Sequence, residues 1–178
     1  MDIKQVVNAV NQMCLDGVID RYAIGGAVGA TFYLEPVATL DVDIFVTFQT
    51  KPGQLLVSPQ PIFDYLTAQG CTVQGEYIVI AGWPVQFLPP PSPLVEEALE
   101  NTVTMDVEGT PARVFTAEYL AAIALQTGRA KDKARLLQFI ESGRMNRDLF
   151  EKNDESFMNS NEDSLKLCSD LGPKTRYN

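Results

Sequence analysis

The chain has 178 residues, a formal net charge of −9 and 46% hydrophobic residues. A chain of this length and composition is expected to form one folded domain with a substantial core. Its acidic balance argues against broad, nonspecific affinity for nucleic acid, because such affinity depends on Lys and Arg that neutralise phosphates. The absence of histidine excludes Ser-His-Asp and Cys-His catalysis and histidine-ligated zinc.

Targeting and redox signals are sparse in this sequence. It has no unbroken apolar run of about 18 residues and no basic-then-apolar amino-terminal signal. We therefore expect a cytoplasmic protein that does not enter a membrane. Cys14, Cys71 and Cys168 are odd in number and widely spaced, which favours reduced thiols over a zinc site.

Hydrophobic periodicity and turn residues predict alternating helices and strands in the first half of the chain. Apolar residues at helical spacing predict an amphipathic helix over residues 2–16 that ends near Gly17. The next predicted elements are a strand at 21–24, a short helix at 27–34 and a strand at 41–48. Pro61 fits the first turn of a further helix, which Gly70 ends.

Two apolar runs rich in aromatic and β-branched residues, at 76–81 and 83–88, are typical of a β-hairpin. The remaining predicted elements are a brief helix from residue 94, short strands at 103–107 and 112–115, and helices at 117–127 and 131–141. Thr116 is expected to cap the helix at 117–127. Because the composition becomes polar after Gly143, residues 143–178 are interpreted as an extension, with 155–178 a mobile or partner-dependent tail.

The most informative pattern is a double glycine followed by an Asp-x-Asp pair. Gly25 and Gly26 follow one short apolar run, and Asp41 and Asp43 open the next. Glycine permits a turn with positive φ and lets a phosphate approach the backbone amides closely. Because side chains alternate along a strand, the two aspartates project from the same face, with Val42 between them.

The paired carboxylates predict a metal site. Two neighbouring anions repel each other and resist desolvation unless a cation joins them. Magnesium prefers carboxylate, water and substrate phosphate oxygens and usually takes one or two protein carboxylates. The pattern predicts Mg²⁺, or Mn²⁺, at Asp41 and Asp43, beside a phosphate site at the glycines. The alternative is a plain glycine turn with aspartates that cap a strand end.

The same residues resemble the signature of the nucleotidyltransferase superfamily: Gly-Gly or Gly-Ser, a helix, and Asp-x-Asp on the next strand. Thr39 lies two positions before Asp41, as in the common Thr-x-Asp-x-Asp form. The segments at 111–120 and 128–135 resemble the later block of small single-domain members, which include abortive-infection type toxins. The similarity covers roughly residues 1–142. It implies one α/β (α+β) domain with a mixed β-sheet flanked by helices and a helical C-terminal part.

The resemblance also implies roles for individual residues. Asp41 and Asp43 would be the catalytic, metal-binding pair. The residues assigned to nucleotide and phosphate binding are Gly25, Gly26, Thr39, Arg129 and Lys131. In the basic block of residues 129–135, Lys133 and Arg135 are weaker candidates for phosphate contact. Asp132 is placed to orient a neighbouring cation by an ion pair.

The implied substrates are a nucleoside triphosphate and a hydroxyl acceptor, which is RNA, a protein or a small molecule. Toxin-like relatives also imply a cognate antitoxin. Many members have a third acidic group on a later strand, and Gln86 stands at the matching position here. Glu76 and Asp106 are candidate substitutes. Val37 and Ala124 also depart from the pattern, because many relatives have an arginine and a lysine there.

These departures leave three interpretations open. The first is a magnesium-dependent nucleotidyltransferase-like enzyme. The second is a catalytically impaired nucleotide-binding or protein-interaction module of the same fold, because the neutral amide of Gln86 cannot act as a general base. The third is a purely structural α/β domain, for which Asp41→Ala and Asp43→Ala would change no metal-dependent nucleotide binding.

Overall fold

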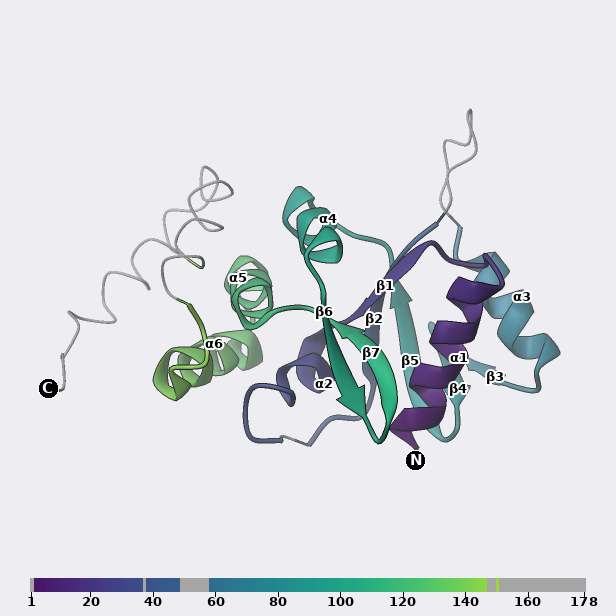
Figure 1. Ribbon diagram of the computed structural model, residues 1–178, viewed down its shortest axis with the longest axis horizontal. Helices are drawn as coiled ribbons and strands as arrows, with labels where there is room; N and C mark the ends of the chain where they lie inside the picture. Colours follow the sequence, from purple (N-terminus) through teal and green to yellow (C-terminus); the bar gives the residue numbers. More distant parts are fainter. Residues whose placement is uncertain (1, 37, 49–57, 147–149, 151–178) are drawn as a thin grey trace, which may run out of the picture.

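The computed structural model describes residues 2–36, 38–48, 58–146 and 150, which form alternating helices and strands (Figure 1). The helices are α1 (Ile3–Leu15), α2 (Gly26–Ala30), α3 (Gln60–Ala68), α4 (Pro93–Glu100), α5 (Ala117–Thr127) and α6 (Ala130–Ser142). The strands are β1 (Arg21–Ile24), β2 (Val42–Thr47), β3 (Thr72–Gln74), β4 (Tyr77–Ile80), β5 (Trp83–Leu88), β6 (Val103–Val107) and β7 (Thr110–Val114). Within these ranges no helix is long and apolar enough to cross a membrane.

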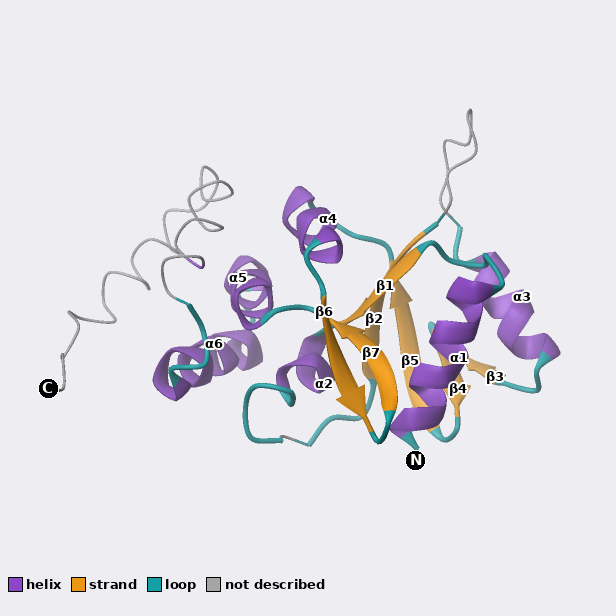
Figure 2. Ribbon diagram, in the orientation of Figure 1, coloured by secondary structure: helices purple, strands orange, loops and turns teal. Residues whose placement is uncertain are grey.

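The strands form one mixed sheet of seven strands in the order β3-β4-β5-β2-β1-β7-β6 (Figure 2). The central strand β2 pairs antiparallel with β1 and parallel with β5. The hairpins β4–β5 and β6–β7 close at two-residue loops, Ala81-Gly82 and Glu108-Gly109, in which both residues have positive φ. Such loops match the right-handed twist of paired strands. A mixed sheet flanked by helices confirms the predicted fold class.

Two apolar cores cover the two faces of this sheet. The first core joins α1 and α3, at the right of Figure 1, to β2 residues that include Ile44 and Val46. The second core joins α4, α5 and α6 to Phe45, which lies between Ile44 and Val46 in β2. Because strand residues alternate between faces, Asp43 shares the face of Phe45. The aspartate pair is therefore directed toward the side of the sheet that α4–α6 cover.

Two local differences from the sequence prediction have physical causes. Helix α2 ends at Ala30 rather than residue 34, because the Thr31 hydroxyl donates to the Val28 carbonyl at 2.7 Å and the following residues form turns. A Thr side chain that bonds to a local carbonyl competes with helix continuation. Strand β3 was not predicted, because its three residues are all exposed at the sheet edge and lack an alternating apolar pattern.

Packing continues beyond residue 142, where the sequence predicts the start of a polar extension. Met145 and Phe150 are buried in the second core. The predicted mobile tail at 155–178 and Cys168 lie outside the described residues. Of the described cysteines, Cys14 and Cys71 form no disulfide, in agreement with the expectation of reduced thiols.

Candidate active site

The double glycine lies against the second aspartate of the Asp-x-Asp pair. The Gly25 backbone N–H donates to the Asp43 carbonyl oxygen at 3.0 Å, which joins the loop after β1 to the start of β2. Gly26 has a φ of +56°, and a Cβ atom there would lie 1.9 Å from Asp43 Oδ2. The position thus requires glycine for its backbone conformation and for the space that the Asp43 carboxylate occupies.

Replacement of Gly26 tests this close approach. We expect Gly26→Ala to displace the Asp43 carboxylate and to cost roughly 1–3 kcal/mol of unfolding free energy for the strained backbone, with a further loss from the clash. Gly17→Ala is the matched control, because Gly17 has a φ of +71° but an added Cβ there would meet no atom within 4 Å. Urea denaturation of both variants measures the difference. Equal losses would show that Asp43 does not constrain Gly26.

Asp41 is held by its own neighbour. The Thr39 hydroxyl lies 3.2 Å from both the Asp41 carbonyl oxygen and Asp41 Oδ1, so it can donate to either. Thr39 is not among the residues that line the cleft described below. Its observed contact therefore supports a role in positioning Asp41, while the predicted role in phosphate binding stays a prediction.

Gln86 lies next to Asp43 in the sheet. The parallel pairing of β2 with β5 places the two residues opposite each other in register. Residues paired across two strands project from the same face of a sheet, so the Gln86 amide occupies the position beside the aspartate pair that the resemblance predicts. Of the candidate acidic substitutes, Glu76 lines the same cleft. Asp106 instead accepts a bond from Gly109 N at 3.0 Å in the β6–β7 turn, at the opposite edge of the sheet.

The basic block lies at the junction of α5 and α6. Asp132, in the first turn of α6, is only 2% exposed. Its carboxylate accepts a 2.5 Å bond from Arg129 Nε and lies 3.5 Å from a guanidinium nitrogen of Arg135. The ion pair predicted for Asp132 is confirmed. Lys131 lines the cleft with both arginines, whereas Lys133 is exposed and is not part of its lining.

Charges from both sides of the cleft act on Asp43. Burial raises the pKa of the Asp43 carboxyl, and the nearby Asp41 carboxylate raises it further. The positive charges of Lys131, Arg129 and Arg135 lower that pKa. A carboxylate destabilised by burial and by a like charge, yet close to cations, gains most from a further positive charge. This is the electrostatic environment expected at a functional carboxylate.

These residues enclose one cleft with a volume of about 630 Å³. Its polar lining comprises Gly26, the two aspartates, Gln86, Glu76 and Tyr77, together with the basic residues Arg129, Lys131 and Arg135. Phe45, Phe115, Leu120 and Ile123 form an apolar floor. Ala124 also lines the cleft, while Val37 lies outside the described residues. Clefts of this size and mixed lining are typical of small-molecule sites.

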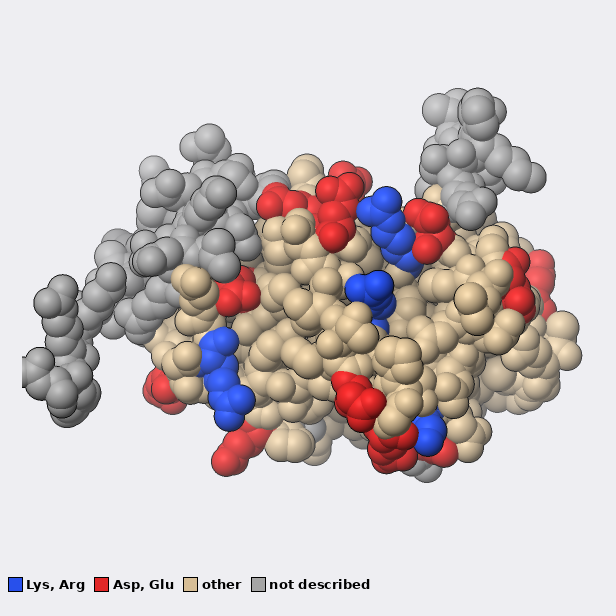
Figure 3. Space-filling view, viewed as in Figure 1, with Lys and Arg blue, Asp and Glu red and all other residues tan. Residues whose placement is uncertain are grey.

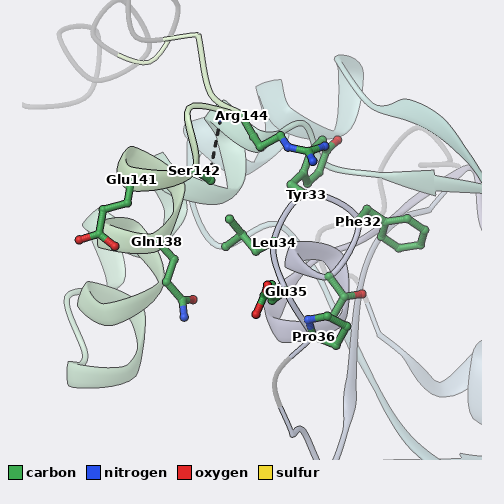
Figure 4. Close-up of a pocket in the computed structure, with 10 residues that line it drawn as sticks. Phe32, Tyr33, Leu34, Glu35, Pro36, Gln138, Glu141, Ser142 and Arg144 are labelled. Atoms are coloured by element: carbon green, nitrogen blue, oxygen red, sulfur yellow. Dashed lines mark hydrogen bonds between the residues drawn. The ribbon is translucent and has the colours of Figure 1, made fainter. Parts of the chain in front are cut away.

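A second cavity, of about 740 Å³, lies between the turns after α2 and the end of α6. Figure 4 shows Tyr33 and Glu35 on one side and Gln138 and Glu141 on the other. It contains none of the residues that the sequence assigns to chemistry. Its carboxylates come from separate elements and form no pair, so the cleft that contains Asp41 and Asp43 is the candidate active site.

Comparison with solved structures agrees with this architecture, although no protein-family model and no curated protein matches the sequence. An antigenic nucleotidyltransferase-like protein from Paracoccidioides brasiliensis is 13% identical, with a TM-score of 0.61, over 96% of this chain and 87% of that chain. This chain has the nucleotidyltransferase fold. The antibiotic-resistance factor ANT(2″)-Ia shares the fold at 15% identity and a TM-score of 0.53, over 97% of this chain and 100% of that chain.

A complex of ANT(2″)-Ia with adenylyl-2″-tobramycin is also similar, at 12% identity and a TM-score of 0.52, over 87% of this chain and 96% of that chain. At these identities the comparisons establish the shared nucleotidyltransferase fold. The abortive-infection type resemblance, which came from the sequence, stays a prediction.

Within the nucleotidyltransferase fold, the donor atoms fit magnesium better than a metal held by protein alone. In the described ranges, no group of three or more His, Cys, Asp and Glu side chains is arranged to hold a metal ion. Asp41 and Asp43 supply two carboxylates, and Gln86 supplies a neutral amide oxygen beside them. Magnesium usually takes one or two carboxylates and completes its ligands with water and substrate phosphates.

Sequence reasoning missed several contributors to this site. Arg135 was ranked below its neighbours, yet its guanidinium lines the cleft and its side chain is only 14% exposed. Tyr77 and the aromatic floor of Phe45 and Phe115 were not assigned to the site. A signal existed for Phe45, because it lies two residues after Asp43 and therefore shares its face of β2. No sequence pattern brings Phe115 to the same place.

Proposed function

We propose that this protein is a magnesium-dependent nucleotidyltransferase, which transfers a nucleoside monophosphate from a nucleoside triphosphate to a hydroxyl group. One observation carries the proposal. A single cleft is lined by Asp41, by Asp43, which lies against Gly26, and by the basic residues Arg129, Lys131 and Arg135. A glycine, basic side chains and two carboxylates in one cleft can together bind a metal ion and a triphosphate. A purely structural domain would not require this combination.

In this reaction, the acceptor hydroxyl loses its proton to solvent, its oxygen forms a bond to the α-phosphorus, and the bond from that phosphorus to pyrophosphate breaks. Asp41 and Asp43 would hold Mg²⁺ or Mn²⁺, which when bound offsets the negative charge of the phosphate oxygens. Arg129, Lys131 and Arg135 would bind the phosphates, for which guanidinium groups are well shaped. Helix α2 has only five residues, so we assign phosphate contact at the glycines to close backbone approach rather than to a helix dipole.

The alternative is a nucleotide-binding module of the same fold that has lost turnover. Its specific support is Gln86, because the residue next to Asp43 is an amide that cannot accept a proton as a general base. The acceptor, a cognate antitoxin and the cytoplasmic location stay predictions under both proposals.

Labelled nucleotides separate the two proposals. The protein would be incubated with Mg²⁺ and each α-labelled nucleoside triphosphate in the presence of tRNA, a cell extract or tobramycin. Transfer of label with release of pyrophosphate supports the enzyme. Magnesium-dependent nucleotide binding with no transfer supports the impaired module. The absence of magnesium-dependent binding would contradict both.

Restoring an acid at the third position is a further test. We expect Gln86→Glu to raise the transfer rate about tenfold or more, because a carboxylate beside Asp43 can accept a proton and bind metal. The same change should lower the thermal midpoint of the metal-free protein, because it adds a third like charge. Gln138→Glu, on the exposed part of α6 outside the cleft, is the control. Transfer slower than that of the original protein would show that Gln86 is adapted to this site.

A further inference from the structure

The sheet carries a row of polar residues that extends away from the aspartate pair. Asp43 on β2 pairs with Gln86 on β5. On the next strand, Ile78 pairs with Val85, so Tyr77 comes level with Gln86 and shares its face of the sheet. Both Gln86 and Tyr77 line the cleft. Asp43, Gln86 and Tyr77 therefore lie side by side on three neighbouring strands, and we call them the polar row.

The polar row runs from β2 toward β4, and Figure 1 shows α6, which carries most of the basic block, on the opposite side of β2 from β4. The pKa of the Asp43 carboxyl is lowered by Lys131 and Arg135 of α6 and by Arg129, the residue that precedes this helix. The Tyr77 hydroxyl instead responds to acids: burial raises its pKa, and so do the Glu76, Asp41 and Asp43 carboxylates. The Glu76 contribution includes a hydrogen bond between the Tyr77 hydroxyl and the Glu76 carboxylate. The cleft has a cationic side at α6 and an acidic side at the β3–β4 turn.

Glu76 gives the acidic side a negative charge that no described Lys or Arg pairs with. It lines the cleft from the turn between β3 and β4. Among the described residues, the ion pairs involve other acids, and none joins a Lys or Arg to Glu76. The Glu76 carboxylate only accepts hydrogen bonds, while the Gln86 amide and the Tyr77 hydroxyl both donate and accept them. Such a surface suits a ligand that carries hydroxyl and ammonium groups.

If the triphosphate binds at the basic block, the second substrate must reach the aspartates along the polar row. The acceptor hydroxyl must reach the α-phosphorus near the aspartates, and the other wall is occupied by cations that match phosphate. We propose that the acceptor is a small hydroxylated amine, bound along the polar row with its ammonium group at Glu76. This inference rests on the proposed function and specifies its second substrate.

A polyanionic acceptor fits this surface poorly. The chain has a net charge of −9. On the face shown in Figure 3, the described acidic and basic side chains are interspersed and form no continuous basic band. RNA binding depends on several Lys or Arg contacts to phosphates. The cations in the cleft are already matched to the nucleotide, and the remaining charged group is the Glu76 carboxylate.

The test compares acceptors that differ in charge. Tobramycin and glucosamine are the amine-bearing probes, glucose is the neutral counterpart of glucosamine, and a short single-stranded RNA is the polyanion. Each is assayed with Mg²⁺ and the nucleoside triphosphate that binds best, by label transfer and by calorimetric binding to the nucleotide-loaded protein. We expect the amine-bearing probes to bind and to be modified in preference to glucose and RNA.

Charge removal at Glu76 identifies the subsite. Glu76→Gln should raise the KM of the amine-bearing probes about tenfold, the usual effect of losing a hydrogen bond to a charged group. The effect should fall on the acceptor KM rather than on the nucleotide KM. Glu141→Gln removes the same charge from an exposed position outside the cleft and is the matched control. Both positions are exposed, so neither variant is expected to affect folding.

The outcomes distinguish this inference from the proposed function. Transfer to RNA, to glucose or to a protein, without transfer to or binding of the amine-bearing probes, overturns the inference and leaves the enzyme proposal intact. An equal effect of Glu76→Gln and Glu141→Gln also overturns it. If nucleotide binding itself does not depend on Mg²⁺, the proposed function fails and the inference fails with it.

Discussion

We expect Asp43→Asn to abolish most nucleotidyl transfer while making the folded protein more stable. Loss of one of two carboxylates that hold the metal should lower kcat/KM by on the order of 100-fold or more, as removal of a key electrostatic group typically does. Stability should rise because burial and the Asp41 charge disfavour ionised Asp43 in the folded protein, as its raised pKa indicates. The neutral asparagine retains the shape without that cost.

The pH dependence of this gain has a defined sign. The ordinary pKa of an aspartate is 3.8, and the folded protein raises it for Asp43. Well below pH 3.8 the carboxyl is protonated in both the folded and unfolded states, so the original protein and the Asp43→Asn variant should be similarly stable. As the pH rises from 3.8 through the pKa of Asp43 in the folded protein, the unfolded state binds fewer protons at this residue than the folded state does. The original protein therefore loses stability relative to the variant.

Thermal unfolding without added metal, followed from about pH 3 to about pH 8, measures that difference. Asp64→Asn is the control, because Asp64 is exposed on α3 and accepts a 2.7 Å hydrogen bond from Gln60. The Asp64→Asn variant should show no increase in the thermal midpoint at neutral pH. Full transfer activity in Asp43→Asn would exclude the proposed role of the pair. A lower midpoint at neutral pH would show that Asp43 is held by favourable contacts.

Local sequence signals predicted the elements that create the site. Helix α1 was predictable because four buried apolar residues follow its period, and Asp2 accepts a hydrogen bond from the Gln5 backbone as an N-cap. The position of Gln86 beside Asp43 also followed from the sequence, because the family resemblance fixed which residue of β5 faces the cleft. Strand periodicity then determines the direction of both side chains.

Properties that depend on tertiary contacts were not accessible in the same way. A charged residue in the first turn of a helix usually lies in solvent, so the burial of Asp132 to 2% exposure has no signature in the sequence. The same holds for Phe115, which reaches the cleft floor because β7 pairs with β1 and the chain then turns toward α5. Such positions are determined by how distant segments pack.

The buried position of Asp132 leads to the second large expected effect. Asp132→Ala should lower the free energy of unfolding by about 1–3 kcal/mol, the usual cost of leaving a buried or partly buried polar partner unsatisfied. The cost is below that of a fully buried ion pair, because the Arg129 side chain is 60% exposed and can be solvated. Arg135, at 14% exposure, has less access to water. Urea denaturation measures this loss.

The same substitution should weaken nucleotide binding about tenfold. It frees the Arg129 and Arg135 side chains, and ordering them again when the nucleotide binds costs side-chain entropy. Lys133→Ala is the control, since Lys133 is an exposed residue of α6 outside the cleft lining. If Asp132 acts through the arginines, its removal from an Arg129→Ala, Arg135→Ala protein should change nucleotide affinity much less than its removal from the original protein. Equal changes in both backgrounds would mean that Asp132 contributes to the nucleotide site by another route.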